Sequence, residues 1–362
     1  MAKNHYTAVS LYSGAGGMDQ GFRDAGFRMQ WAVDADRWAV ESYRRNLGQH
    51  IMRGILPGVD LPAGIGPDLV FGGPPCQGFS VIGRMDPGDP RSAHVFCFMD
   101  IVERLGPRAF VLENVKALAV SSRWTHVRDG LRDWAQRLGY HSAFFVLNAA
   151  HYGVPQARER MFLVGIRGAT PLLPTETTRG APLTVGDVLR ALPPVGHSGN
   201  DGMCRARVVP AKRPVMRPTA HAGSLLFNGS GRPLRLDAPA KTIPASMGGN
   251  ATPIVDQREL DHGGESWVVG YHAYLLSGGR PLGSAPAFLR RITVQEAAAL
   301  QTFPQQWQLS GPQVAQYRQI GNAVPPRLAY AVGLSVRQVL QCIDGCKPGE
   351  ESPEPSPQML VA

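Results

Sequence analysis

The stretch TAVSLYSGAGGMDQGFRDA, residues 7–25, joins a strand pattern to a helix pattern through a glycine-rich turn. Its apolar start predicts a strand at 7–12, and the residues after the glycines predict a helix at 18–25. The same order recurs with a strand at 28–33 and a helix at 37–46. Strands that alternate with helices form βαβ units. We therefore expect an α/β fold with a doubly wound, mostly parallel sheet covered on both faces.

The rest of the chain divides into regions of different texture. Further strands are predicted at 68–71 and 109–112, and further helices at 96–105, 293–300 and 326–341. From about Gly168 the chain is rich in Pro, Gly and Arg and has no sustained period, which predicts a second, loop-rich domain. The last residues, 347–362, combine Pro, Glu and Ser and are expected to form a disordered tail.

The composition limits the class of protein. A chain of 362 residues with 43% hydrophobic residues can bury a sizeable core, and its formal net charge of +9 weakly favours a polyanionic partner. Its start lacks the apolar region of a signal peptide and no stretch resembles a membrane span, so we expect a cytoplasmic protein with no membrane partner. The five cysteines are scattered, which suits neither a disulfide framework nor a zinc site, and we expect no metal.

A basic segment lies in the loop-rich domain. From Arg205 to Arg235 the chain carries no acidic residue. Five of its basic residues are the candidate nucleic-acid contacts: Arg205, Arg207, Lys212, Arg213 and Arg217. They form either a solvated basic face or a phosphate-binding surface, and we favour phosphate contact.

The glycine-rich turn also predicts a cofactor site. Glycines between a strand and a helix let the backbone approach a ligand, and Asp34 at the end of the next strand can accept both hydroxyls of a ribose. This pairing indicates a cofactor that contains adenosine. A dinucleotide fingerprint would place a third glycine where this chain has Asp19. Because an acid is tolerated where no pyrophosphate binds, the cationic cofactor S-adenosylmethionine fits better than NAD.

A thiol and a carboxyl group each follow a predicted strand. Cys76 lies in the turn GGPPCQGFS at 72–80, and Glu113 ends the strand that begins at 109. Because the carboxyl ends of strands share one rim of a doubly wound sheet, the two side chains can converge on one crevice. A thiolate added to C6 of cytosine makes C5 nucleophilic, a carboxyl group can protonate N3, and Arg160 or Arg158 can stabilise charge at O2.

That chemistry requires the cytosine to leave the base stack. In a duplex C6 is inaccessible, so the base has to be flipped into a pocket. The polar, Gly- and Pro-rich segment 81–91 is the expected closing loop.

Six motifs in this order resemble those of the cytosine-C5 DNA methyltransferases. They are LYSGAGG (11–17), PPCQGFS (74–80), ENV (113–115), QARER (156–160), EAAALQTFP (296–304) and QIGNAVP (319–325). The resemblance implies an S-adenosylmethionine-dependent enzyme that acts on double-stranded DNA. It implies that Cys76 is the nucleophile, that Glu113 contacts N3 and the 4-amino group, and that Arg160 lies at O2 with Arg158 supporting the thiol.

The resemblance further assigns residues and domains. Cofactor contacts are expected from Tyr12, Ser13, Gly14, Gly16, Gly17, Met18, Asp34, Ala35, Asp60, Pro74, Asn322 and Val324, and DNA contacts from Gln77, Ser80 and Arg84 besides the basic segment. The expected regions are a catalytic domain at 1–181, a target recognition domain at 182–288, a hinge at 289–318 and a return to the catalytic domain at 319–346.

Some positions depart from the family pattern. Tyr12 stands where Phe is usual, and Asp34 stands where Glu is usual. The acid that binds the adenine amino group is assigned to Asp60, although Gly54-Ile55-Leu56 has the usual distance from Cys76 but no acid. His94 replaces a common Leu near the adenine, and the sequence assigns it no role.

Three other functions fit the sequence less well. A tRNA cytosine methyltransferase of the same family would share the pocket, but the long basic insertion favours duplex DNA. A catalytically inactive DNA-binding relative would have no need of Cys76, Glu113 and Arg160 together. An NAD-dependent oxidoreductase is disfavoured by Asp19. We expect a monomeric bacterial modification enzyme, paired in function with a restriction endonuclease.

Overall fold

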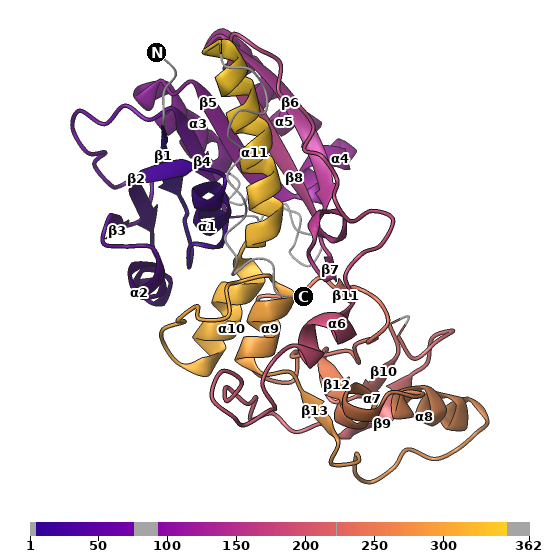
Figure 1. Cartoon of the computed structure of the whole chain (residues 1–362). Coiled ribbons are helices and arrows are strands. Elements are labelled where there is room, and N and C mark those ends of the chain that lie inside the picture. The colour runs from indigo at the N-terminus through magenta and orange to yellow at the C-terminus, as the bar shows by residue number, and fades with distance from the viewer. Residues whose placement is uncertain (1–4, 76–92, 222, 346–362) are drawn as a thin grey trace.

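A computed structural model describes residues 5–75, 93–221 and 223–345 of the chain (Figure 1). The first part is built from the strands β1 (Tyr6–Leu11), β2 (Phe27–Asp34), β3 (Ile51–Arg53), β4 (Leu69–Gly72), β5 (Ala109–Val115), β6 (Tyr140–Asn148) and β8 (Glu159–Arg167). Its helices are α1 (Gly17–Asp24), α2 (Arg37–Asn46), α3 (His94–Leu105), α4 (Lys116–Val120) and α5 (Thr125–Arg137). The strand and helix pattern predicted for residues 7–46 is confirmed to within a few residues.

Seven strands form one sheet in the order β3-β2-β1-β4-β5-β8-β6. The strands from β3 to β5 are parallel, whereas β8 runs antiparallel to both β5 and β6. The doubly wound, mostly parallel sheet is therefore confirmed. The order reverses direction at β1, so the carboxyl ends of β1, β2, β4 and β5 open onto one crevice.

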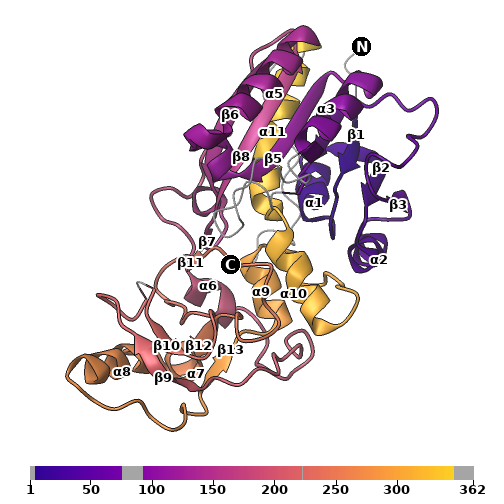
Figure 2. The same cartoon turned by 180° about the vertical axis from the view of Figure 1, so that it is seen from behind.

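Apolar layers cover both faces of the sheet. Along β1, Ala8 faces a core that includes Phe22 of α1 and the helix α11 (Pro326–Ile343), while Val9 faces a core shared with α3 and α5. Figures 1 and 2 show α11 crossing one face and α3 with α5 on the other. The last helix of the described residues thus completes the first domain, about 300 residues after the domain begins.

The second part contains short elements joined by long loops. They are α6 (Val185–Arg190), β9 (Pro210–Val215), β10 (Leu225–Phe227), β11 (Ala240–Lys241), β12 (Ile254–Asp256), α7 (Gln257–His262), α8 (Trp267–Leu276) and β13 (Leu289–Arg291). Strand β9 pairs with β10 and β12 pairs with β13, both antiparallel. The two parts also contact each other through β7 (Gln156–Ala157) of the first part, which pairs in parallel with β11.

Two of the predicted boundaries lie at elements of the structure. Strand β13, which opens the predicted hinge at 289–318, pairs with β12 of the second part. The boundary at residue 318 lies within α10 (Gln313–Asn322), which follows α9 (Val294–Leu300). Because α9 shares a core with α6 and β12, this hinge is packed against the second part.

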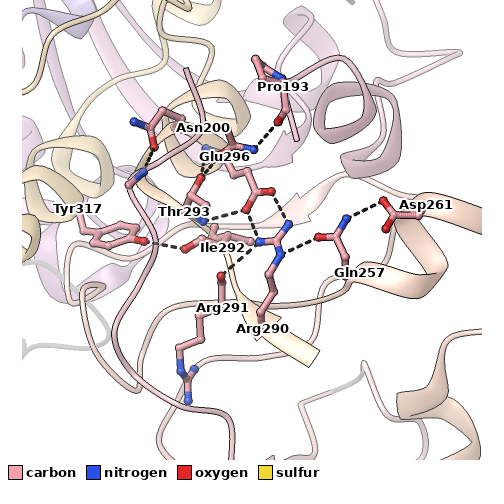
Figure 3. A network of polar contacts seen from close by, with 12 residues as sticks. Pro193, Asn200, Gln257, Asp261, Arg290, Arg291, Ile292, Thr293, Glu296 and Tyr317 are labelled. Atoms are coloured by element: carbon pink, nitrogen blue, oxygen red, sulfur yellow. Dashed lines mark hydrogen bonds and ion pairs between the residues drawn. The ribbon is translucent and has the colours of Figure 1, made fainter. Parts of the chain in front are cut away.

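A buried polar network holds that junction together (Figure 3). Arg290 donates to both carboxylate oxygens of Glu296, at 2.7 and 2.6 Å, and also to Gln257. Glu296 is 1% exposed and accepts from the Thr293 backbone at the start of α9. Glu296 therefore belongs both to this ion pair and to the capping box that begins α9.

The helices along the described ranges are each too short or too polar to cross a lipid bilayer.

Candidate active site

A cavity of about 140 Å³ lies at the carboxyl ends of the central strands. The segments around it come from β1 and the glycine-rich turn, from the ends of β2, β4 and β5, and from α10. Its described lining includes Ser10, Tyr12, Ser13, Gly14, Gly17, Met18, Asp19, Asp34, Asp36, Gly73, Glu113, Arg318, Asn322 and Val324. The structure thus brings most of the predicted cofactor residues together with Glu113.

The glycine-rich turn forms one wall of the cavity. Gly14 has a φ of 56°, and its backbone N–H donates to Asp34 Oδ2 at 2.8 Å. The other oxygen of Asp34 accepts from the Asp36 backbone at 2.8 Å. Burial raises the pKa of Asp34, although these backbone hydrogen bonds oppose the shift. Asp34 is therefore held with both oxygens in fixed positions at the end of β2.

His94 fixes the aromatic ring that follows β1. Tyr12 has a φ of 55°, unusual for a residue with a side chain, and its hydroxyl lies 3.0 Å from Nδ1 of His94. The two rings meet edge to face with their centroids 5.6 Å apart. The residue to which the sequence assigned no role thus orients Tyr12 at the cavity.

The chain end returns to the cavity through α10. Asn322 and Val324 line it, and Gln301 holds this segment by donating to the carbonyl oxygens of Ile320 and Ala323. Arg318, which the sequence analysis missed, also lines the cavity and forms an ion pair of 2.7 Å with Asp36. The two residues are 282 positions apart, and no local pattern signals such a pair.

Four predicted cofactor residues do not line this cavity: Gly16, Ala35, Asp60 and Pro74. Gly16 instead packs against the end of α2, where a Cβ would clash with the Leu47 side chain. Ala35 is exposed beside Asp34. Asp60 is exposed on the loop after β3, so the structure does not place its carboxyl group at the cavity. The spacing of Asp60 from Cys76 in the sequence does not fix the path of this loop.

Glu113 and Arg160 form an ion pair beside the cofactor cavity. Arg160 Nε lies 3.0 Å from Glu113 Oε1, and the two side chains are 15% and 12% exposed. Antiparallel pairing of β5 with β8 creates this contact. Burial raises the pKa of Glu113, and the positive charges of Arg160 and Arg158 reduce the shift. A Cβ at Gly73 would lie 2.8 Å from Glu113 Oε2, so glycine there leaves room for the carboxyl group.

Arg158 is almost completely buried beside the site. It is 2% exposed and donates to the carbonyl oxygens of Ile243 at 3.3 Å and Gly321 at 3.0 Å. Arg158 therefore joins three segments of the chain next to the site. Its support of the thiol stays a prediction, because Cys76 lies outside the described residues.

The predicted DNA contacts divide into two groups. Gln77, Ser80, Arg84 and the closing loop at 81–91 lie outside the described residues. The side chains of Arg205, Arg207, Lys212, Arg213 and Arg217 are all exposed, on β9 and its flanking segments. Within the described ranges, no group of His, Cys, Asp and Glu side chains is arranged to hold a metal ion.

Solved structures share this architecture. A methyltransferase from Entamoeba histolytica, EhMeth, superposes with a TM-score of 0.64 at 15% identity, covering 93% of this chain and 99% of that one. The Dnmt2 methyltransferase of S. pombe gives a TM-score of 0.63 at 18% identity, covering 92% and 99%. At these identities the comparison establishes the fold, which is that of the methyltransferases with a Rossmann-like sheet.

Sequence comparison identifies the family. Residues 6–338 match the family described as C-5 cytosine-specific DNA methylase. The Type II methyltransferase M1.HphI of Haemophilus parahaemolyticus is 31% identical over 354 residues, covering 91% of this chain and 86% of the relative. M.AplI of Arthrospira platensis is 32% identical over 347 residues, covering 94% and 88%. The chain belongs to the C-5 cytosine-specific DNA methylase family and is a DNA cytosine-5-methyltransferase.

Proposed function

We propose that this enzyme transfers a methyl group from S-adenosylmethionine to C5 of a cytosine flipped out of double-stranded DNA, as the modification partner of a restriction endonuclease. The observation that carries the proposal is the Glu113–Arg160 pair, because Glu113 opens onto the cavity that the glycine-rich turn surrounds. Glu113 would thereby border both the pocket for the base and the cavity for the methyl donor.

The charges of the cavity suit the cofactor. Among its described lining residues, the charged side chains are Asp19, Asp34, Asp36, Glu113 and Arg318. Carboxyl groups outnumber the guanidinium, which favours a ligand with excess positive charge. Asp34 would hold the ribose hydroxyls, Tyr12 would lie against the adenine, and Asn322 with Val324 would close the other side. When bound, S-adenosylmethionine supplies an electrophilic methyl group.

Glu113 and Arg160 supply the chemistry at the base. Since burial raises the pKa of Glu113, its carboxyl group can carry the proton that N3 of cytosine takes up. Arg160 would stabilise the negative charge that develops toward O2, and it remains paired with the carboxylate that Glu113 leaves behind. The pair therefore keeps the charge of the pocket balanced as the proton moves.

Cys76 is the proposed nucleophile. Its thiolate forms a bond to C6 while the ring electrons shift toward N3, which takes the proton from Glu113. C5 would then bond to the methyl carbon while the bond from that carbon to the cofactor sulfur breaks and the electron pair stays on that sulfur. Loss of the C5 proton to a base or water, return of the N3 proton to Glu113 and cleavage of the bond between the Cys76 sulfur and C6 restore the thiolate and the aromatic ring. Prolines 74 and 75 stiffen the chain that leads to Cys76, and the Pro74 carbonyl accepts from Asn114 at 3.2 Å.

The second domain supplies the DNA contacts in this proposal. Exposed Lys212 and Arg213 lie on β9, where an extended strand projects basic side chains from the sheet of β9 and β10. Such side chains bind phosphates and fix the register of the duplex, whereas base contacts select the sequence. We expect the enzyme to act as a monomer, because one recognition domain accompanies one catalytic site.

Parallel assays on duplex DNA and tRNA test the proposal. We expect bisulfite sequencing of DNA from expressing cells to reveal a new methylation pattern at one short sequence. A duplex with 5-fluorocytosine at that position should be trapped covalently by the wild type and by Cys342→Ser, but not by Cys76→Ser. Methylation of tRNA alone would assign the enzyme to RNA, and an unchanged DNA pattern without trapping would indicate an inactive relative.

A further inference from the structure

Asp19 is a buried acid at the wall of the cofactor cavity. It lies in the first turn of α1 and is 0% exposed. Its carboxylate accepts from the Tyr43 hydroxyl at 3.0 Å, and Ser10 of β1 lies beside it. Burial raises the pKa of Asp19 to about 7, against the lowering effect of these hydroxyl groups. The chemistry of methyl transfer at the base gives this carboxyl group no task.

A chain of hydrogen bonds leads from Asp19 toward solvent. The Tyr43 hydroxyl that contacts Asp19 also lies 2.9 Å from Nε2 of His50. Tyr43 is buried on α2, whereas His50 is partly exposed at the start of β3. A Cβ at Gly16 would lie 3.1 Å from the Tyr43 ring, so these hydrogen bonds lie directly behind the glycine-rich turn. Burial and nearby Arg23 lower the pKa of His50.

Charged groups on the neighbouring elements surround the hydrogen-bonded Asp19, Tyr43 and His50. Asp34 of β2 raises the pKa of Asp19, and Arg23 of α1 acts on both Tyr43 and His50. The cavity adds further charged groups: Asp36, Glu113 of β5 and Arg318 of α10. At the far end of α1, α11 contributes Tyr330 near Asp24 and the guanidinium of Arg337 near Ala25. Asp19 thus belongs to a mainly acidic wall.

We propose that Asp19, Tyr43 and His50 form a proton relay that favours the charged methyl donor over the uncharged product. This inference rests on the proposed cofactor. S-adenosylmethionine carries a sulfonium and an ammonium against one carboxylate, whereas S-adenosylhomocysteine has lost the sulfonium charge. A cation in the cavity favours the ionised form of Asp19, so its binding expels a proton. Methyl transfer removes that cation and with it the attraction to the carboxylate, so Asp19 takes up a proton again and the product is held less tightly than the methyl donor.

The proton moves without leaving Tyr43 charged. In the neutral state Asp19 donates its proton to the Tyr43 oxygen, and Tyr43 donates to Nε2 of His50. On ionisation the Asp19 proton passes to Tyr43, the former Tyr43 proton passes to His50 Nε2, and His50 releases a proton to water. The lowered pKa of His50 favours release of the proton from its imidazole.

Calorimetric titration of the full chain measures this coupling directly. We compare S-adenosylmethionine, S-adenosylhomocysteine and sinefungin, which has an ammonium in place of the sulfonium, in buffers of different ionisation enthalpy. With a pKa of about 7 for Asp19, the Kd of both cations should rise about tenfold from pH 8 to pH 6, with release of nearly one proton at the lower pH. S-adenosylhomocysteine, which is an uncharged thioether at sulfur, should release no proton on binding.

Variants separate the relay from a structural network. Asp19→Asn should flatten the pH dependence for the cations and bring their affinity close to that of the thioether. Tyr43→Phe removes a hydrogen bond that stabilises the ionised acid and should move the pH dependence to higher pH. Asp24→Asn, on the same helix but outside the cavity, should behave as the wild type.

The outcomes distinguish the two proposals. If the wild type binds none of the three ligands, both the cofactor assignment and the relay are refuted. If the ligands bind without proton release, or if Asp19→Asn retains the wild-type pH profile, the relay is refuted while the cofactor assignment stands. Should Asp19→Asn fail to fold by circular dichroism, an unshifted profile in Tyr43→Phe refutes the relay.

Discussion

Replacement of Glu113 by Gln tests the proton donor in the base pocket. Gln has nearly the same shape but cannot deliver a proton to N3. General acid catalysis contributes about 10²–10⁴-fold in rate, so we expect the rate constant of methyl transfer to fall by that factor. The ion pair with Arg160 is lost as well, at side chains that are 15% and 12% exposed. The free energy of unfolding should therefore fall by about 1–3 kcal/mol.

Single-turnover methyl transfer to a duplex, with enzyme in excess, isolates the chemical step. Because burial raises the pKa of Glu113, the wild-type carboxyl group is active while protonated, and the rate should decline as the pH rises through that pKa. Glu113→Gln should lack this decline.

Glu159→Gln is the matched control. Glu159 is a neighbour on β8 that pairs with Lys116 at 2.8 Å, but the two side chains are 46% and 43% exposed. Its loss should change the rate by less than about twofold, because exposed pairs contribute little. A Glu113→Gln enzyme that transfers methyl groups within fivefold of the wild-type rate would refute the assignment of Glu113 as proton donor.

Other side chains give further predictions. Glu296→Ala leaves Arg290, whose side chain is only 16% exposed, without its carboxylate and should lower the free energy of unfolding by about 3–5 kcal/mol in urea denaturation; a loss below 1 kcal/mol would contradict the structural role of the network in Figure 3. Changing Lys212 and Arg213 to Ala should reduce the slope of log K for DNA against log salt by about 2, and an unchanged slope would remove β9 from the interface. Phe22→Ala removes a ring stacked 4.4 Å from Phe71 and should cost about 3–5 kcal/mol in thermal unfolding.

The sequence could predict the features that depend on neighbouring residues. The strand, glycine turn and helix at 7–25 could be predicted because the spacing of apolar residues reflects which face of each element is buried. The order of six motifs identified the family, which the comparisons confirm. Helix α8 escaped prediction because its residues are apolar on most sides and therefore show no helical period.

The tertiary structure decided which distant residues meet. Tyr12 meets His94 across 82 positions, and Asp36 meets Arg318 across 282, contacts that depend on how whole elements pack. Asp60 is exposed and is not among the residues that line the cavity. The sequence alone determined the alternation of strands and helices and the family, because the first depends on the local spacing of apolar residues and the second on the order of the motifs. Only the fold decided the neighbours of each functional side chain, because burial and distance arise from segments far apart in the chain.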